Sequence, residues 1–243
     1  MKLIRYALAL CPILPLVAVV SPPFSGKGIN RQSLLIASAA SKTFIDGNSN
    51  TYTAWNLSAS GLSEQAFDEA VKGYTWLLQN NMINKPGVLT IIDYSKASTQ
   101  KRLYILDMRS GKILFNTLVA HGRNSGYNYA TDFSNDEESH KSSLGFYVTQ
   151  NTYTGANGYS LKLKGCEKGI NDNATNRAIV IHGAAYVSED FIRNSGCLGR
   201  SFGCPAVPLA VHKKIIDTIK NGTCIFLYHS TKTYSTHSKI LDS

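Results

Sequence analysis

The sequence predicts a mainly β, α+β fold, a β-sandwich or mixed sheet with a few peripheral helices. Nineteen glycines and 13 tyrosines against two tryptophans in 243 residues are typical of a loop-rich fold with strands, not of a helical bundle. A hydrophobic fraction of 43% is enough for a buried core and excludes wholesale disorder. From Gly87 onward, short apolar runs bounded by turn residues follow one another, as the strands of a sheet do.

The amino end is typical of an export signal. Lys2 and Arg5 precede an apolar run from Tyr6 to Val20, which is shorter than the roughly 20 residues that a membrane-spanning helix needs. We therefore expect a signal peptide over residues 1–21, with a retained anchor or a lipoprotein as alternatives. The mature chain is then exported, to the periplasm or cell envelope, and has no stable membrane span.

The rest of the chain divides into a main domain and its flanks. Ser, Asn, Thr and Gly are frequent after the signal and the periodicity is weak, which predicts a flexible lead-in. The expected segments are the lead-in at 22–56, an N-terminal helical segment at 57–85 that packs on the main domain, the main domain at 86–230, and a C-terminal tail at 231–243.

Two helices are expected. Apolar residues between Leu62 and Leu78 recur at helical spacing, and Ser63 can cap the first turn of this helix. The second helix opens at Pro208 and runs to Lys220. The expected strands lie at 88–93, 102–107, 113–120, 144–150, 159–163, 178–181 and 223–228, with a hairpin turn at 109–112 between the second and the third.

The chain is basic, with 25 Lys and Arg against 16 Asp and Glu and a net charge of +9. This charge favours polyanionic partners: nucleic acid, an anionic membrane surface or an acidic cell-wall polymer. No nucleic-acid-binding motif accompanies it, and export takes the chain away from nucleic acid. We therefore expect no nucleic-acid partner.

A cysteine and a histidine carry the chemistry that the sequence predicts. His182-Gly183 ends the strand-like segment RAIVIHG, and Cys204 lies in the glycine-rich segment GRSFGCPAV at 199–207. The imidazole can take or hold the thiol proton, the thiolate can attack a carbonyl, and loop N–H groups can stabilise the oxyanion. The pair is therefore a candidate for nucleophilic acyl transfer.

Three other side chains are candidates for the same cleft. His121 also follows a strand and precedes a glycine, so it is a rival base or a loop contact near the cleft. Ser201 either donates to the substrate or closes the turn, and Tyr186 either lines the groove or packs in the core.

The remaining cysteines leave their pairing open. If Cys204 stays reduced, then Cys166, Cys197 and Cys224 allow one disulfide and one buried thiol; pairing of all four would instead make every mature cysteine structural. No C-x-x-C or other metal-ligand spacing occurs. We expect neither a metal nor a cofactor.

The segment at 182–205, HGAAYVSEDFIRNSGCLGRSFGCP, resembles the signature of the murein L,D-transpeptidase catalytic (YkuD-like) family, in the branch with GRSxGCP in place of SHGC. Segments 92–107, 119–126 and 142–163 read like the same branch. The resemblance covers roughly residues 88–229 and implies an L,D-transpeptidase-like catalytic domain at 86–230.

The resemblance implies a role for each matching residue. Cys204 matches the nucleophile, His182 matches its histidine, and the carbonyl of Gly183 matches the group that orients the imidazole. The N–H groups of Gly203 and Cys204 would form the oxyanion hole, and Arg200 would face the substrate carboxylate. Phe202 and Pro205-Ala206 depart from the commoner pattern, which has a histidine before the cysteine and Arg or Asn after it.

The implied substrates are peptidoglycan stem peptides. Such an enzyme attacks the third residue of a tetrapeptide donor, expels the terminal D-alanine and passes the acyl group to an amine acceptor. The product is a 3→3 cross-link or an attached wall acceptor. Two alternatives stay open: an L,D-carboxypeptidase that uses water as the acceptor, and a non-catalytic wall-binding module with structural cysteines.

Overall fold

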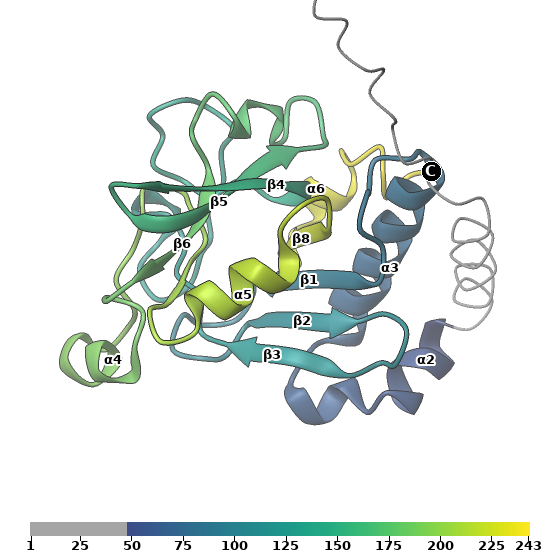
Figure 1. Cartoon of the computed structure of the whole chain (residues 1–243), viewed down its shortest axis with the longest axis horizontal. Helices are drawn as coiled ribbons and strands as arrows, with labels where there is room; N and C mark the ends of the chain where they lie inside the picture. Colours follow the sequence, from purple (N-terminus) through teal and green to yellow (C-terminus); the bar gives the residue numbers. More distant parts are fainter. Residues whose placement is uncertain (1–47) are drawn as a thin grey trace, which may run out of the picture.

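One mixed sheet of eight strands forms the centre of the protein (Figure 1). A computed structural model describes residues 48–243, so the predicted signal peptide and the lead-in up to residue 47 lie outside the described residues. The strands are β1 (Val88–Asp93), β2 (Leu103–Asp107), β3 (Ile113–Thr117), β4 (Gly145–Gly155), β5 (Gly158–Gly165), β6 (Val180–Ala184), β7 (Ala206–Pro208) and β8 (Cys224–Tyr228). The predicted fold class, a mainly β mixed sheet with a few peripheral helices, is confirmed.

The sheet runs in the order β3-β2-β1-β8-β4-β5-β6-β7. The pairs β1–β8 and β6–β7 are parallel, and the other pairs are antiparallel. Past the end of β3, the N–H of Ala120 donates to the carbonyl of Ala206 in β7 at 2.8 Å. This bridge joins the two edges of the sheet, so the segment after β3 lies against the segment that leads into β7.

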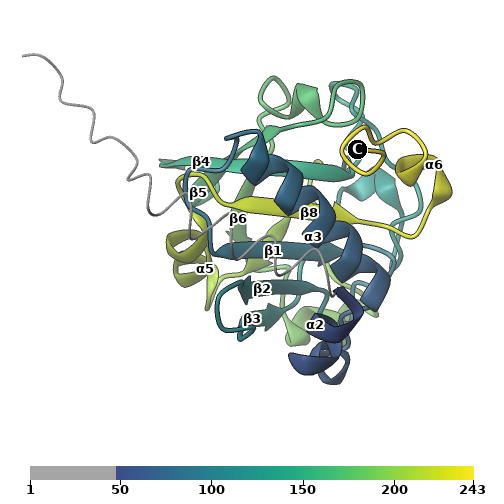
Figure 2. The same cartoon turned by 90° about the vertical axis from the view of Figure 1, so that its right-hand side faces the viewer.

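Helix α3 (Glu64–Gln79) covers one face of the sheet, over β1 and β8 (Figure 2). As the sequence predicts, Ser63 caps it: its side chain accepts the N–H of Ala66 at 3.2 Å. A Cβ on Gly73 would stand 2.0 Å from the ring of Phe146, so the helix can approach β4 this closely only with glycine at that position.

The remaining helices lie at the periphery. They are α2 (Asn48–Ala54), α4 (Glu189–Ser195), α5 (His212–Ile219) and α6 (Lys232–Ser235), with 3-10 helices η1 (Leu57–Ser60), η2 (Arg123–Ser125) and η3 (Asp172–Ala174). Within residues 48–243, no helix combines the length and the apolar character needed to cross a membrane.

Two of these helices differ from the sequence expectations. Helix α2 lies inside the segment expected to be a flexible lead-in, where the rings of Tyr52 and Trp55 each lie 5.9 Å from that of Phe67 in α3. The expected helix from Pro208 begins four residues later, at His212, because Pro208 belongs to β7. In both places the segment contacts a more distant part of the chain: α2 packs on Phe67 of α3, and Pro208 pairs with β6.

The segment expected to be a C-terminal tail packs on the sheet. Tyr234 and Ser238 are buried and donate hydroxyl hydrogen bonds to the buried carboxyl group of Glu167. The main-chain N–H of Phe146 donates to the same carboxyl group at 2.7 Å. Glu167 thus ties α6 to β4 across the core.

Candidate active site

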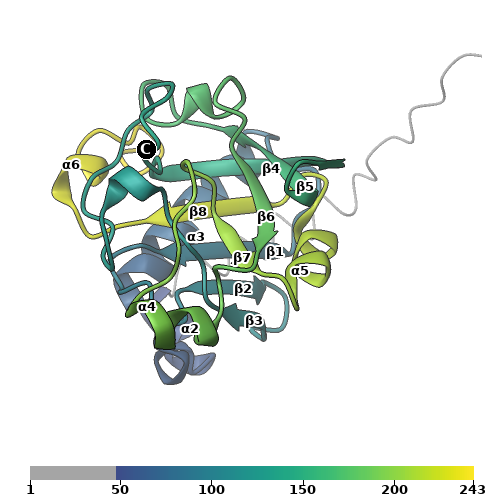
Figure 3. The ribbon, with the colours of Figure 1, turned by 90° about the vertical axis from the view of Figure 1, so that its left-hand side faces the viewer.

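Strands β6 and β7 lie side by side at one end of the sheet (Figure 3). His182 in β6 pairs in register with Ala206 in β7, and Cys204 stands two residues before Ala206. The Sγ of Cys204 accepts the N–H of Val180, also in β6, at 3.4 Å. The predicted nucleophile and base therefore stand on adjoining segments, although α4 separates them in sequence.

His182 is held as a neutral imidazole. Only 5% of it is exposed, and its Nδ1 donates to the carbonyl of Gly183 at 3.1 Å, which leaves Nε2 without the proton. Burial lowers the pKa of His182, and His212 lowers it further, against the opposing effect of the Gly183 carbonyl. An imidazole in this state can accept a proton from a neighbouring group.

The Cys204 thiol bonds to main-chain groups. Its Sγ accepts from Val180 and lies 3.8 Å from the carbonyl of Ala178; within residues 48–243, it makes no hydrogen bond with His182. Burial raises the pKa of Cys204, whereas the Val180 N–H and the guanidinium of Arg177 lower it. The thiol is therefore protonated when it faces β6.

The loop before β7 is closed by Ser201. Its hydroxyl donates to the carbonyl of Cys204 at 2.6 Å and accepts the N–H of Gly203 at 3.1 Å. Of the two expected oxyanion-hole donors, the Gly203 N–H is thus bonded within the loop, whereas the Cys204 N–H has no partner among the described residues. Gly203 has φ +118°, and a Cβ there would stand 2.8 Å from the carbonyl oxygen of Lys141.

Arg200 and Tyr186 flank this loop. Arg200 is exposed, and its Nη1 donates to the carbonyl of Gly126 at 3.1 Å. Tyr186 is half-buried, its carbonyl accepts the N–H of Gly199 at 3.0 Å, and burial together with nearby Cys204 raises its pKa to about 12. The Tyr186 hydroxyl therefore stays protonated near the thiol.

His121 lies in the interior. Its ring is fully buried and bonded at both nitrogens: Nδ1 accepts from Nη2 of Arg102 at 2.7 Å, and Nε2 donates to the carbonyl of Gly126 at 3.3 Å. Its own carbonyl accepts the N–H of Ser201 at 3.0 Å. The main chain of His121 therefore supports the loop that contains Ser201, and its ring lies in the interior.

The buried ring of His121 should make stability depend on pH. Burial and then the charge of Arg102 lower its pKa from 6.5 to about 4. The unfolded chain takes up this proton first as the pH falls, so stability is lost between pH 6.5 and 4, by about 3 kcal/mol for this group. His121→Asn keeps an acceptor for Arg102 but cannot titrate, so urea unfolding should show a smaller loss over this range.

The matched control for this measurement is His237→Asn, which replaces an exposed histidine. It should leave the loss of stability between pH 6.5 and 4 as it is in the wild type. The loss that remains in His121→Asn comes from the buried or half-buried His182 and His229, whose pKa values burial also lowers. An unchanged loss in His121→Asn would contradict the prediction.

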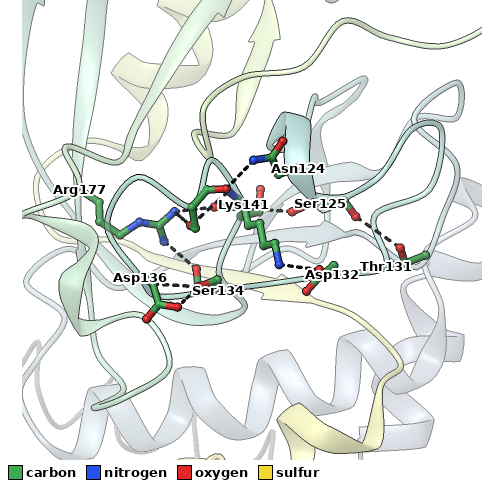
Figure 4. Close-up of polar contacts among 10 residues, drawn as sticks. Asn124, Ser125, Thr131, Asp132, Ser134, Asp136, Lys141 and Arg177 are labelled. Atoms are coloured by element: carbon green, nitrogen blue, oxygen red, sulfur yellow. Dashed lines mark hydrogen bonds and ion pairs between the residues drawn. The ribbon is translucent and has the colours of Figure 1, made fainter.

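Arg177 opens the RAIVIHG segment, but the sequence carries no signal of its role, because its partners are distant in the chain. Its guanidinium donates to the carbonyl of Ser134 at 2.8 Å and to three acceptors in residues 139–143 (Figure 4). Nη2 also lies 3.1 Å from the place of a Cβ on Gly203. Arg177 thus anchors residues 134–143 next to the Cys204 loop and places a positive charge near the thiol.

Removing this charge should make the thiol harder to ionise. In Arg177→Gln, the midpoint of the pH profile for alkylation of Cys204 should rise, because only the Val180 N–H still opposes burial. Arg177→Lys keeps the charge but not the paired donors, so it separates electrostatics from loop support. Arg193→Gln, at an exposed arginine of α4, is the control. An Arg177→Gln midpoint equal to that of the control would contradict the prediction.

All four cysteines in residues 48–243 are free thiols: Cys166, Cys197, Cys204 and Cys224. The disulfide that the sequence allows among Cys166, Cys197 and Cys224 is therefore not formed. Within the same residues, no group of three or more His, Cys, Asp or Glu side chains is arranged to hold a metal ion.

The site thus combines a neutral histidine in β6 with a free cysteine in the loop just before β7, which together form a candidate nucleophile–base pair on a mixed sheet. The chain belongs to the L,D-transpeptidase catalytic domain family, whose model matches residues 58–228. No curated protein matches the chain.

Solved structures of two L,D-transpeptidases and of a cell shape determining protein are similar to this chain at low identity. The enzyme from Mycobacterium smegmatis has 12% identity and a TM-score of 0.36 over 58% of this chain and 58% of that one. The enzyme from Stackebrandtia nassauensis has 16% identity and a TM-score of 0.36 over 67% and 66%. The helical cell shape determining protein Pgp2 of Campylobacter jejuni has 15% identity and a TM-score of 0.39 over 66% and 55%. Each match spans less than two thirds of the solved chain.

Proposed function

We propose that the protein is an L,D-transpeptidase, a cysteine acyltransferase that acts on peptidoglycan stem peptides through an acyl-enzyme at Cys204. It forms 3→3 cross-links or attaches a wall acceptor. One observation carries the proposal: in a chain of this family, an imidazole whose Nδ1 is anchored on the carbonyl of Gly183 stands on the strand beside a free cysteine. This tautomer leaves Nε2 of His182 available for the thiol proton.

In the first step, Sγ of Cys204 turns from Val180 toward His182, and Nε2 takes its proton. The thiolate attacks the carbonyl carbon of the third residue of a tetrapeptide donor, and the oxyanion accepts the free N–H of Cys204. The carbon–nitrogen bond to the terminal D-alanine then breaks. Nε2 returns its proton to the leaving amine, and a thioester on Cys204 remains.

In the second step, an amine of another stem attacks the thioester. Its surplus proton passes to His182, the carbon–sulfur bond breaks, and the departing thiolate regains a proton. With water as the acceptor, the same sequence gives an L,D-carboxypeptidase. The basic charge of the chain and its expected export signal support action on an anionic wall polymer in the periplasm or cell envelope, with no nucleic-acid partner.

The GRSFGCP loop supports assignment to the GRSxGCP branch of the family. In this loop, the Ser201 hydroxyl bridges the main-chain N–H of Gly203 and the main-chain carbonyl of Cys204, and the φ of +118° at position 203 favours glycine. The free state of the four described cysteines argues against a wall-binding module with structural disulfides.

The test is a product analysis with the full chain and purified tetrapeptide muropeptides, read by mass spectrometry. Dimers linked 3→3 support the proposal, or a transferred stem peptide does when a wall amine is supplied as acceptor. Shortened monomers alone would replace it by the carboxypeptidase. Muropeptides recovered intact at every pH between 5 and 8 would overturn both.

A further inference from the structure

A cavity adjoins the Cys204 loop on the side of α4. It has a volume of about 470 Å³ and lies between the loop after Gly122, the helix α4 and residues 197–202. Neither Cys204 nor His182 lines it. Its main lining residues are Arg123, Tyr127, Phe191, Leu198, Arg200 and Phe202. We call it the arginine–aromatic cavity.

Two guanidinium groups and two exposed aromatic rings line this cavity. Cζ of Arg200 lies 5.0 Å from the ring centre of Tyr127, and Cζ of Arg123 lies 5.7 Å from that of Phe202. The two aromatic residues are 60% and 64% exposed, in a protein that buries most of its large apolar side chains. Each ring makes a cation–π interaction with the neighbouring guanidinium group, which leaves the positive charge unneutralised.

Neither arginine is paired with an acid. Within residues 48–243, the ion pairs join Lys141 to Asp132, Arg193 to Asp190 and Lys220 to Asp217. Nη1 of Arg200 donates to main-chain carbonyls of Arg123 and Gly126, and the guanidinium of Arg123 makes no hydrogen bond with a described residue.

These guanidinium groups can bind an oxyanion, such as the carboxylate of a peptide. A guanidinium presents parallel N–H groups that match a carboxylate, and a ligand carboxylate would gain most where no protein acid competes. The apolar side chains of Phe191 and Leu198 line the same cavity, so an aliphatic peptide segment can fill the space between the charges.

We propose that the arginine–aromatic cavity is a subsite for a carboxylate-bearing stem peptide, with Arg123 and Arg200 as its carboxylate receptors. This inference rests on the proposed function, because stem peptides are the acidic peptides that such an enzyme meets. The carboxylate belongs to the donor stem or to the acceptor stem. The main-chain N–H of Arg123 donates to the carbonyl of Ser201 at 2.7 Å, so the segment that carries this arginine contacts the loop that presents Cys204.

The first experiment measures binding without reaction. The full chain with Cys204→Ala is titrated with a free stem tetrapeptide and with the same peptide amidated at its carboxylates. Adding Arg123→Gln should weaken binding of the free peptide by about tenfold, the value of one charge-assisted pair, and binding of the amidated peptide by less than twofold. Arg123→Lys, which keeps the charge without the fork, should fall between. Arg193→Gln is the control, on α4 but outside the cavity.

Equal affinity of Arg123→Gln and the control for the free peptide would overturn the subsite, as would an equal loss for both peptides. Because Cys204 is absent, this result does not depend on whether the protein transfers or hydrolyses. In the reactive chain, a raised KM for the donor in Arg123→Gln assigns the carboxylate to the donor, and a raised KM for the acceptor assigns it to the acceptor. Two unchanged KM values overturn the subsite even if products form.

Discussion

Cys204→Ala should abolish formation of the acyl-enzyme and of cross-linked dimers, with a loss of at least about 10³-fold in rate. The reason is chemical: no other described residue beside His182 offers a sulfur that can become a thiolate and then a leaving group. The measurement is intact-protein mass spectrometry after incubation with tetrapeptide muropeptides. The wild type should gain the mass of the acyl group, and the variant should gain none.

The matched control is Cys166→Ala. Cys166 is a half-buried free thiol just past the end of β5, and burial raises its pKa to about 12. It therefore stays protonated at neutral pH, and its removal should leave both the adduct and the dimers. An acyl adduct on the Cys204→Ala variant would contradict Cys204 as the nucleophile and overturn the proposed function. Loss of the adduct in the Cys166→Ala variant would do the same.

Several elements of the fold could be predicted because their signal is local. The apolar residues of α3 recur at helical spacing and Ser63 caps it, and the buried run of β8 has turn residues on both sides. Helix α4 has cap residues at Ser188 and Gly196 but buries none of its side chains, so it lacks the hydrophobic period on which the prediction depends. Strand β7 has three residues, and its pairing with β6 is visible only in three dimensions.

The residues of the candidate site also divide into those with a local sequence signal and those whose role depends on distant contacts. Cys204 and His182 stand in motifs whose residue types indicate their chemistry, so the sequence predicts the pair. For Ser201, the sequence allows two roles: donation to the substrate or closure of the turn. The structure favours closure of the turn, because the hydroxyl both donates and accepts a hydrogen bond within the loop. Arg177 has no sequence signal, because its partners are main-chain carbonyls and serine hydroxyls more than 30 residues away.

Arg102 is the clearest example of a residue that only the fold explains. It is fully buried, and its guanidinium donates to the carbonyl of Val119 twice, at 2.9 and 3.1 Å, to the carbonyl of Lys96 at 2.8 Å, and to Nδ1 of His121 at 2.7 Å. Burial lowers its pKa from 12.5 to about 10, which corresponds to a cost of about 3 kcal/mol for the charge. Four bonds from a charged donor stabilise by roughly 1.5–3 kcal/mol each, which outweighs this cost.

Arg102→Met should therefore lower the free energy of unfolding by about 3 to 5 kcal/mol, because the two carbonyls and the imidazole keep their places in the core and lose their donors. Urea unfolding at pH 7 measures this loss. Arg109→Met, at an exposed arginine of the turn between β2 and β3, is the control and should change stability by less than about 0.5 kcal/mol. A loss below about 1 kcal/mol in Arg102→Met would mean that water reaches Val119 and His121. The main-chain contact between His121 and Ser201 would then not depend on this buried charge.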